Sequence, residues 1–295
     1  MTSVSIIGPG RVGGALALAL PKKDFSIENL IFRSDAQRTE DLASLAGAAS
    51  ISTFANISDI ASDIVFITTQ DAEIASVAKN LALNLSGKPF VFHTSGALSS
   101  KVLDDLSAVG CRTGSIHPLV SVSSAEAGPE RFKGSYFCIE GQQEALDLAR
   151  EIVTSLGGIS FSVDTGFKTL YHAAAVTACG HLVALFDAAV EMMTKCGLSE
   201  EESKKILLPL VKSTVQNIGE QSTASALTGT FARADVETFV EHLKVLNTTV
   251  SDEILEIYLL LGERSLELAA KQGVSQERVD RLRTKVSIAK SKLKW

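Results

Sequence analysis

The chain has 295 residues, of which 45% are hydrophobic and 21% are charged, and its formal net charge is −6 at pH 7. This length is comfortable for two domains, and the composition is ordinary for a globular enzyme. The acidic balance argues against nucleic-acid binding, because no broad positive field is available to attract phosphate backbones. No apolar run approaches the roughly 20 residues that a membrane-spanning helix needs. We therefore expect neither a nucleic-acid partner nor a membrane partner.

The N-terminus and the cysteines indicate the cellular compartment in which the protein works. The chain begins with a strand-like segment that lacks the charged lead and the cleavage pattern of a signal peptide. Its four cysteines form no C-x-x-C pair and have no histidine at zinc-ligand spacing, so we expect buried thiols in a reducing cytoplasm and no metal site. These cysteines are Cys111, Cys138, Cys179 and Cys196.

The first candidate for function is a glycine-rich turn that follows the first apolar run. The segment from residue 4 to 14 reads V-S-I-I-G-P-G-R-V-G-G, and an Ala/Leu-rich helix follows directly. With a strand before it and a helix after it, G-x-G-x-x-G is the pattern that binds a dinucleotide pyrophosphate on free backbone N–H groups. The alternative is a turn that only packs. The residues that we expect to bind the cofactor here are Gly8, Gly10, Arg11, Val12 and Gly13.

The first half of the chain alternates strand-like and helix-like segments, which predicts βαβ units and a doubly wound, mostly parallel sheet. Several strands, such as I-V-F-I-T and F-V-F, are apolar on both faces, as suits a sheet that helices cover on both sides. The predicted strands are residues 3–7, 29–32, 64–68, 89–92, 112–116, 135–139 and 159–163. The predicted helices are residues 13–20, 39–46, 72–83, 101–109 and 143–156.

The character of the sequence changes after about Asp164, and nearly all of the remainder reads as helix. We therefore predict a Rossmann dinucleotide-binding domain over residues 1–164 and an all-helical domain, for substrate binding and dimerisation, over residues 165–295. A long helix over about residues 167–195 opens the second domain.

Local signals predict where the later helices begin. Ser199 with Glu202 has the spacing of a capping box. A loop over residues 224–234 precedes a helix that Asp235 is expected to cap.

The end of the second predicted strand bears on the choice of dinucleotide, because an acid there binds a ribose 2′-hydroxyl and an arginine accommodates a 2′-phosphate. The chain offers Arg33 followed by Ser34, and Arg11 adds a second positive charge. One charge-assisted contact is worth roughly 1.5–3 kcal/mol, which favours NADP by about ten- to a hundredfold. Asp35 is the competing feature, because it would serve the 2′-hydroxyl of NAD if the strand ended later. We predict NADP.

Two histidine-containing turns follow adjacent predicted strands. His93 opens H-T-S-G-A-L and His117 opens H-P-L, so both lie at the carboxyl edge, where open α/β sheets bind ligands. We expect both histidines to contact substrate and Ser95 to contact the cofactor. The alternative is that each histidine is structural and binds loop carbonyls. Thr68 and Thr69, after an earlier strand, are expected to line the path of the cofactor.

The start of the long helix carries the candidate chemistry. Lys168 and His172 are four residues apart and therefore lie on one face of the helix. Hydride transfer to a carbonyl carbon leaves negative charge on the oxygen, which needs a hydrogen-bond donor and a cation nearby. Lysine is protonated at neutral pH unless it is deeply buried, and histidine can donate or relay a proton. The alternative is that Lys168 caps the helix and His172 is an interface residue.

A loop in the helical half, A-L-T-G-T-F-A-R-A-D, supplies further substrate candidates. Its Arg233 has the planar geometry that holds a carboxylate through two hydrogen bonds, and Thr228 lies in the same loop. The alternative is that Arg233 pairs with Asp235 and orders the loop.

Taken together, G-P-G-R-V-G, H-T-S-G-A-L, H-P-L, K-x-x-Y-H-A-A-A-V and A-L-T-G-x-x-x-R-x-D resemble the Rossmann-like proteins whose C-terminal half is a domain of unknown function. The resemblance covers nearly the whole chain. These proteins are similar to NADP-dependent ketopantoate reductases, pyrroline-carboxylate reductases and β-hydroxyacid dehydrogenases, with a C-terminal domain like that of 6-phosphogluconate dehydrogenase. The resemblance implies an oxidoreductase in which Lys168 acts in catalysis and His172 is the polar residue one turn on.

The chain departs from the pattern of that family in its second half. C-G stands at residues 179–180 where the family has Ser-Asn, so a polar group that could orient substrate is missing. T-G-T at residues 228–230 and R-A-D at residues 233–235 replace T-G-P and R-G-D. These departures leave the residues expected to bind the cofactor unchanged. They affect the residues expected to recognise the substrate and therefore concern which substrate is bound.

We therefore predict an NADP-dependent reductase of a small oxo-acid, with ketopantoate as the first candidate. Lys168 would stabilise and protonate the nascent alkoxide, His172 would support it, and Arg233 would hold a carboxylate. Two other functions stay open: a regulatory protein that senses NADPH without turnover, and an oxidoreductase that passes hydride between NADP and a deazaflavin. We also expect a homodimer formed through the Ala/Leu-rich helical domain.

Overall fold

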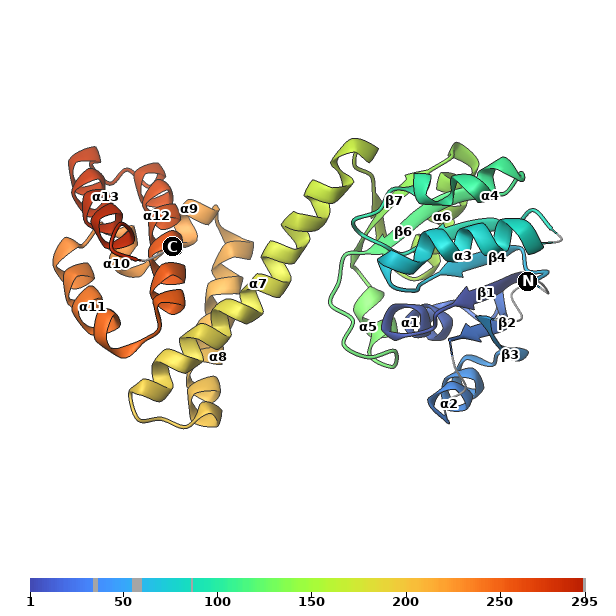
Figure 1. Cartoon of the computed structure of the whole chain (residues 1–295), viewed down its shortest axis with the longest axis horizontal. Coiled ribbons are helices and arrows are strands. Elements are labelled where there is room, and N and C mark those ends of the chain that lie inside the picture. Colours follow the sequence, from blue (N-terminus) through green and yellow to red (C-terminus); the bar gives the residue numbers. More distant parts are fainter. Residues whose placement is uncertain (34–36, 55–59, 86, 294–295) are drawn as a thin grey trace. The chain divides into compact units, whose positions relative to one another are not determined.

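The computed structural model describes residues 1–33, 37–54, 60–85 and 87–293 (Figure 1). The chain folds into two compact units, Met1–Cys179 and Gly180–Trp295. The limit between the units lies inside one continuous helix, α7 (Lys168–Lys195). The sequence analysis placed the limit near residue 164, where a short 3-10 turn precedes this helix.

The first unit is built on one eight-stranded sheet with the strand order β3-β2-β1-β4-β5-β6-β7-β8. Neighbouring strands are parallel, except that β6 and β7 run antiparallel. Strands β2 and β3 lie on one side of β1, whereas β4 and the later strands lie on its other side. The strand order thus reverses between β1 and β4, which is the switch point where open α/β sheets bind ligands. The predicted α/β fold class is confirmed. The strands are β1 (Thr2–Ile7), β2 (Phe25–Phe32), β3 (Ser50–Thr53), β4 (Ile64–Ile67), β5 (Phe90–His93), β6 (Arg112–Pro118), β7 (Tyr136–Gly141) and β8 (Ile159–Phe161).

Apolar side chains on both faces hold the sheet between helices. All four residues of β4 are buried. Ile64 and Phe66 belong to one hydrophobic cluster with residues of α1 and α6, whereas Val65 and Ile67 belong to a second cluster with residues of α3 and α4. Because successive residues of a strand point to opposite faces, helices cover both sides of the sheet, as the apolar strands predicted.

The helices of the first unit differ from the prediction in two places. The segment predicted as one helix over residues 101–109 divides into a 3-10 turn, η2, and a short α4. Helix α5 was not predicted; it lies so close to α1 that a Cβ atom at Gly128 would be 2.0 Å from the Cβ atom of Ala15. The elements are α1 (Arg11–Ala19), α2 (Gln37–Ala46), α3 (Asp71–Asn84), η2 (Ser100–Leu103), α4 (Asp104–Ala108), α5 (Gly128–Phe132) and α6 (Gln143–Ser155).

Helices build the described part of the second unit. The capping box of Ser199 and Glu202 is confirmed, and so is the cap at Asp235, whose carboxylate accepts from the N–H of Thr238. The loop predicted over residues 224–234 instead contains two one-turn helices, because a serine hydroxyl caps the first of them. The helices are α8 (Glu200–Glu220), α9 (Thr223–Ala226), α10 (Gly229–Ala232), α11 (Val236–Thr249), α12 (Asp252–Lys271) and α13 (Gln276–Lys290).

Helix α7 is unusually apolar. With its preceding turn it spans Thr165–Lys195 and is long and apolar enough to cross a membrane; it is the one such helix among the residues described. The expectation that no apolar run reaches this length is therefore wrong, because no Asp, Glu, Lys or Arg stands between Lys168 and Asp187. The helix is also poorly covered, with 6% of its most apolar window buried.

Candidate functional site

The turn between β1 and α1, residues 8–13, is held by contacts with neighbouring strands; we call it the glycine turn. Gly8 has a φ of +78°, which favours glycine, and its N–H donates to the carbonyl oxygen of Ile31 at 2.8 Å. The hydroxyl of Thr68 donates to the carbonyl oxygen of Gly8 at 2.7 Å. A Cβ atom at Gly13 would lie 2.1 Å from this hydroxyl. Both glycines are therefore required by the turn, as the dinucleotide fingerprint expects.

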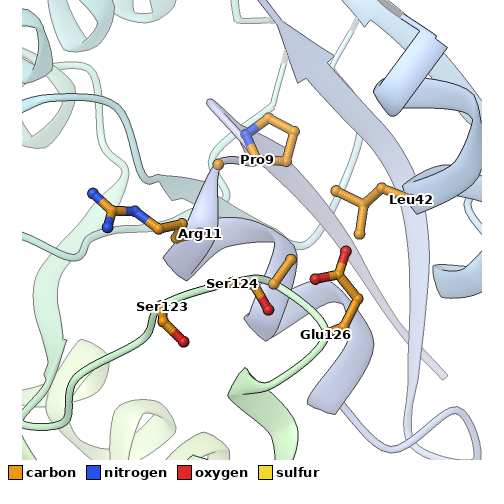
Figure 2. Close-up of a pocket in the computed structure, with 8 residues that line it drawn as sticks. Pro9, Arg11, Leu42, Ser123, Ser124 and Glu126 are labelled. Carbon is orange, nitrogen blue, oxygen red and sulfur yellow. The ribbon is translucent and has the colours of Figure 1, made fainter. Parts of the chain in front are cut away.

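Backbone donors without side-chain caps lie at the start of α1. Gly10 is the N-cap, and no side-chain hydrogen bond caps this helix within the described residues. Arg11 and Val12 follow, and Arg11 is exposed. The free N–H groups and the helix dipole favour an anion here. A pocket of about 430 Å³ adjoins the turn (Figure 2), and it is lined by Pro9, Gly10, Arg11, Leu42, Ser123, Ser124, Ala125 and Glu126.

Arg33 lies directly after β2, and its side chain is exposed. Its guanidinium forms an ion pair with the carboxylate of Glu73, in the first turn of α3. A 2′-phosphate that reaches Arg33 has to share it with this carboxylate or displace it. Ser34 and Asp35, which the sequence analysis weighed with Arg33, lie outside the described residues.

The turn after β5 is shaped by its own side chains. His93 is fully buried, and its Nδ1 atom accepts from the N–H of Ser95 at 3.2 Å. The hydroxyl of Ser95 in turn accepts from the N–H groups of Ala97 and Leu98, at 3.2 and 3.0 Å. His93 and Ser95 thus order the turn, and their direct contact with a ligand stays a prediction. The hydroxyl of Thr69, after β4, is buried without a partner in the described structure, as expected of a group that awaits a ligand.

His117 on β6 and His172 on α7 lie side by side; we call them the histidine pair. Their ring centroids are 5.8 Å apart and the rings are nearly perpendicular, at 80°. The Nδ1 atom of His117 shares a 2.7 Å hydrogen bond with the hydroxyl of Tyr171. A Cβ atom at Gly96 would lie 2.8 Å from His117 Nε2 and 2.5 Å from His172 Nδ1. Both imidazoles therefore pack onto bare backbone at Gly96, and both are partly exposed.

Lys168, the first residue of α7, is only 1% exposed. Its ammonium donates to the hydroxyl of Ser115 on β6 and lies 3.6 Å from the carboxylate of Glu140 on β7. Glu140 also accepts from the N–H and the hydroxyl of Ser100, at 2.8 Å each, and from the hydroxyl of Thr165 at 3.2 Å. The sequence analysis expected this ammonium to contact substrate. The structure instead surrounds it with protein groups, which makes it a buried cation behind the site.

Burial controls the protonation of the histidines. It lowers the pKa of His93 to about 3, with help from the Lys168 ammonium. It lowers the pKa of His117 to about 4, and His172 and Lys168 add to this effect. Burial also lowers the pKa of Lys168, against the opposing attraction of Glu140. His117 is therefore a neutral imidazole at neutral pH, with one nitrogen that donates and one that accepts.

The remaining candidates belong to the second unit. Thr228 and Arg233 flank α10 and are both exposed. The carboxylate of Asp235 accepts from the N–H and the hydroxyl of Thr238, and these bonds are the main reason that its pKa is lowered. Asp235 thus serves as a helix cap, and the guanidinium of Arg233 is accessible to a ligand.

The sequence analysis did not select four residues that build the site. Glu140 is a charged residue in the otherwise apolar strand β7, and that interruption was the available signal of a buried polar group. Ser115 stands among other polar residues of β6 and gave no such signal. Tyr171 appeared in the sequence analysis only as part of the K-x-x-Y-H motif. No role was assigned to it, because its hydrogen-bond partner, His117, lies 54 positions away. Gly96 looked like an ordinary turn glycine.

Residues 1–118 match a Rossmann-like domain, and residues 135–265 match the domain of unknown function DUF2520. The chain combines these two domains. The resemblance that its motifs predicted is therefore confirmed. No match was found among curated proteins.

Solved structures with the same fold match at least 90% of this chain. A Bacteroides fragilis protein, provisionally named an NADP oxidoreductase, is 22% identical with a TM-score of 0.72, covering 90% of this chain and 97% of its own. A Thermotoga maritima protein is 26% identical with a TM-score of 0.70, covering 91% and 99%. A 1-pyrroline-5-carboxylate reductase from Streptococcus pyogenes is 15% identical with a TM-score of 0.58, covering 96% and 98%.

The pKa of His93 predicts a loss of stability in acid. The folded state keeps His93 neutral down to a pH of about 3, whereas the unfolded chain takes up a proton near its ordinary pKa of 6.5. The unfolded state therefore binds more protons as the pH falls through this window, and between pH 7 and pH 5 this histidine lowers the free energy of unfolding by about 2 kcal/mol. Urea denaturation at several pH values measures the free energy of unfolding. Between pH 7 and pH 5, this free energy should fall by about 2 kcal/mol less in His93→Gln than in the wild-type protein. His181→Gln, at an exposed position of α7, is the control; an equal pH dependence in all three proteins would contradict the assignment.

Proposed function

We propose that the chain is an NADP-dependent oxidoreductase that reduces a small oxo-acid, with ketopantoate as the first substrate to test. One observation carries the proposal: the order of groups along one edge of the sheet. The glycine turn follows β1, two threonines follow β4, the H-T-S-G-A-L turn follows β5, and the histidine pair lies at the end of β6. These strands are neighbours. A dinucleotide whose pyrophosphate binds the glycine turn can therefore extend along this edge to the histidine pair.

The residues present fit this cofactor. The glycine turn offers backbone N–H groups, Thr69 offers a buried hydroxyl without a partner in the described structure, and Arg33 offers a cation for a 2′-phosphate. Structures of the same fold support the choice of NADP. The Bacteroides fragilis protein is provisionally named for it, and a pyrroline carboxylate reductase from Plasmodium falciparum, 16% identical with a TM-score of 0.55, has NADP bound.

The reduction needs a hydride at the carbonyl carbon and a proton at the carbonyl oxygen. When bound, NADPH supplies the hydride, which carries both electrons. His117, as a neutral imidazole, donates a hydrogen bond to the oxygen while negative charge develops there. His172 is the second ring at this place, and the proton that completes the hydroxyl reaches the oxygen from solvent through the histidine pair.

Lys168 contributes its charge and not a direct contact. Its ammonium is held by Ser115 and Glu140, so it stays behind the histidine pair while substrate binds and leaves. A fixed positive charge in a poorly solvated place stabilises a negative oxygen more strongly than the same charge in water. Arg233 is the group that we propose for the substrate carboxylate, with Thr228 beside it in the same loop, because its guanidinium is exposed and has the geometry for two parallel bonds.

The function is tested by following NADPH absorbance with a panel of oxo-acids and cyclic imines. We expect oxidation with at least one oxo-acid, and His117→Asn should lower kcat by at least about a hundredfold while the Kd for NADPH changes less than about twofold. His181→Asn is the control. Tight NADPH binding without oxidation would favour a sensor, and oxidation only with a deazaflavin would favour the third function. No affinity for NADPH or NADH would refute all three.

The cofactor preference is tested at Arg33 and Glu73. Arg33→Ala should weaken NADPH binding by about ten- to a hundredfold and NADH binding much less, because only NADPH carries the 2′-phosphate. Glu73→Gln should tighten NADPH binding severalfold, since it releases the guanidinium. Glu144→Gln, which breaks the exposed ion pair with Arg112, is the matched control. Titration calorimetry measures each Kd, and equal losses for both cofactors in Arg33→Ala would contradict the assignment.

We propose that the protein is a cytoplasmic homodimer. Its four cysteines are free in the structure; Cys111 and Cys138 are buried as expected, whereas Cys179 and Cys196 are exposed. Helices α7 and α8 expose large apolar side chains, among them Val183 and Leu210. Patches of this kind mark interaction sites. Light scattering should give twice the chain mass of 31.3 kDa. Val183→Glu should shift the mass toward the monomer, whereas Leu83→Glu, at an exposed position of α3, should not; a monomeric wild-type protein would end the proposal.

A further inference from the structure

The pairing between Tyr171 and His117 has a consequence for the chemistry of the histidine. A neutral imidazole carries one proton, and a partner on one nitrogen decides which nitrogen holds it. His117 Nδ1 lies 2.7 Å from the hydroxyl of Tyr171, and the two rings meet edge to face with centroids 5.7 Å apart. The other nitrogen, Nε2, lies on the side of Gly96 and His172. The two nitrogens of this ring thus face two different surroundings.

Hydrogen-bond accounting selects one of two arrangements. If Tyr171 donates to Nδ1, the proton of His117 lies on Nε2, the hydroxyl proton of Tyr171 has an acceptor, and Nε2–H is left available to donate to a ligand. If Nδ1–H donates instead, the hydroxyl proton of Tyr171 needs another acceptor, and His117 Nδ1 is the one hydrogen-bond partner found for this hydroxyl within the described structure. Burial raises the pKa of Tyr171 above its ordinary value, so the hydroxyl keeps its proton at neutral pH. The first arrangement is therefore favoured.

Packing also fixes where the hydroxyl points. The ring of Tyr171 meets the ring of Phe161, on β8, edge to face with centroids 5.8 Å apart. Its backbone belongs to the first turn of α7, which the buried ammonium of Lys168 attaches to β6 and β7. Phe161 and Lys168 therefore hold Tyr171 from two sides, and the hydroxyl has little freedom to leave His117.

We propose that Tyr171 is a positioning residue that donates its hydroxyl hydrogen bond to His117 Nδ1, so that the proton of the imidazole stands on Nε2 and faces the reacting oxygen. The value of this arrangement for catalysis rests on the proposed function, because a carbonyl reductase needs a donor at that oxygen. The tautomer itself is a property of the free protein. With the proton on Nδ1, Nε2 would meet the carbonyl oxygen lone pair to lone pair.

The chain contains a second pair of the same geometry, which provides the control. His242 Nδ1 lies 2.7 Å from the hydroxyl of Tyr258. This pair belongs to the helical unit: Tyr258 packs against Phe231 and Phe239, and His242 is exposed. Tyr258→Phe therefore removes the hydroxyl that binds His242 and leaves His117 and His172 unchanged.

The experiment is a ¹⁵N spectrum of the full chain with labelled histidine, in which protonated and unprotonated ring nitrogens resonate far apart. His117, assigned by its loss in His117→Asn, should show a protonated Nε2 and an unprotonated Nδ1. Tyr171→Phe should turn this signal into a mixture of both tautomers, whereas Tyr258→Phe should change only His242. A protonated Nδ1 in the wild-type protein, or an unchanged tautomer in Tyr171→Phe, would overturn the proposal.

Kinetics then separate positioning from mere folding. Loss of one neutral hydrogen bond corresponds to roughly a three- to tenfold change, so Tyr171→Phe should lower kcat by that factor and leave KM for NADPH unchanged. Equal kcat in Tyr171→Phe and wild type would remove the catalytic part of the proposal. If no oxo-acid is turned over but the tautomer is as described, the proposed function fails while the positioning of His117 stands.

Discussion

The buried ion pair between Lys168 and Glu140 is the constraint on which the rest of the site depends. Two buried charges are costly to desolvate, and they are tolerated only where further hydrogen bonds satisfy them. Glu140 has such bonds from Ser100 and Thr165, and Lys168 has one to Ser115. The cluster ties the start of α7 to the edge of the sheet, and the residues of the next helical turn inherit their positions from it.

The same region holds two histidines without accumulating charge on them. Burial is the main reason that the pKa values of His93 and His117 are lowered, and the nearby Lys168 ammonium adds to this effect. Both rings are therefore neutral and serve as directional hydrogen-bonding groups, while the positive charge is concentrated on a residue that cannot leave. Under the proposed function, this arrangement would separate two tasks, stabilising charge and contacting the substrate, that a single exposed lysine would combine.

Local sequence patterns were sufficient to predict the parts of the fold that depend on residues close together in the chain. The glycine turn, the apolar strands and the capping box at Ser199 each depend on residues a few positions apart, so the sequence predicted them. Strand β3 was missed because its short S-I-S-T segment is largely exposed and gives little apolar signal. The apolar character of α7 was missed because hydroxyl groups and histidines interrupt the apolar sequence without adding formal charge.

The sequence analysis selected most residues of the candidate site, but it did not predict the contacts between them. His93, His117, Lys168 and His172 were all selected, because each follows a strand or opens a helix at the expected edge. The contacts that define their roles join distant positions: Tyr171 with His117, Lys168 with Ser115 and Glu140. No spacing rule reports such pairs. The ion pair between Arg33 and Glu73 was hidden for the same reason, since it joins two separate βα units.

Gly96 has a consequence of a different kind. Two imidazoles rest against it only because it has no side chain, so the geometry of the histidine pair depends on a missing Cβ atom. Adding one methyl group there would push both rings aside and leave the glycine turn, two strands away in the sheet, as it is. In this chain, the lack of a side chain at residue 96 therefore bears on the histidine pair alone and not on the turn that is expected to hold the nucleotide.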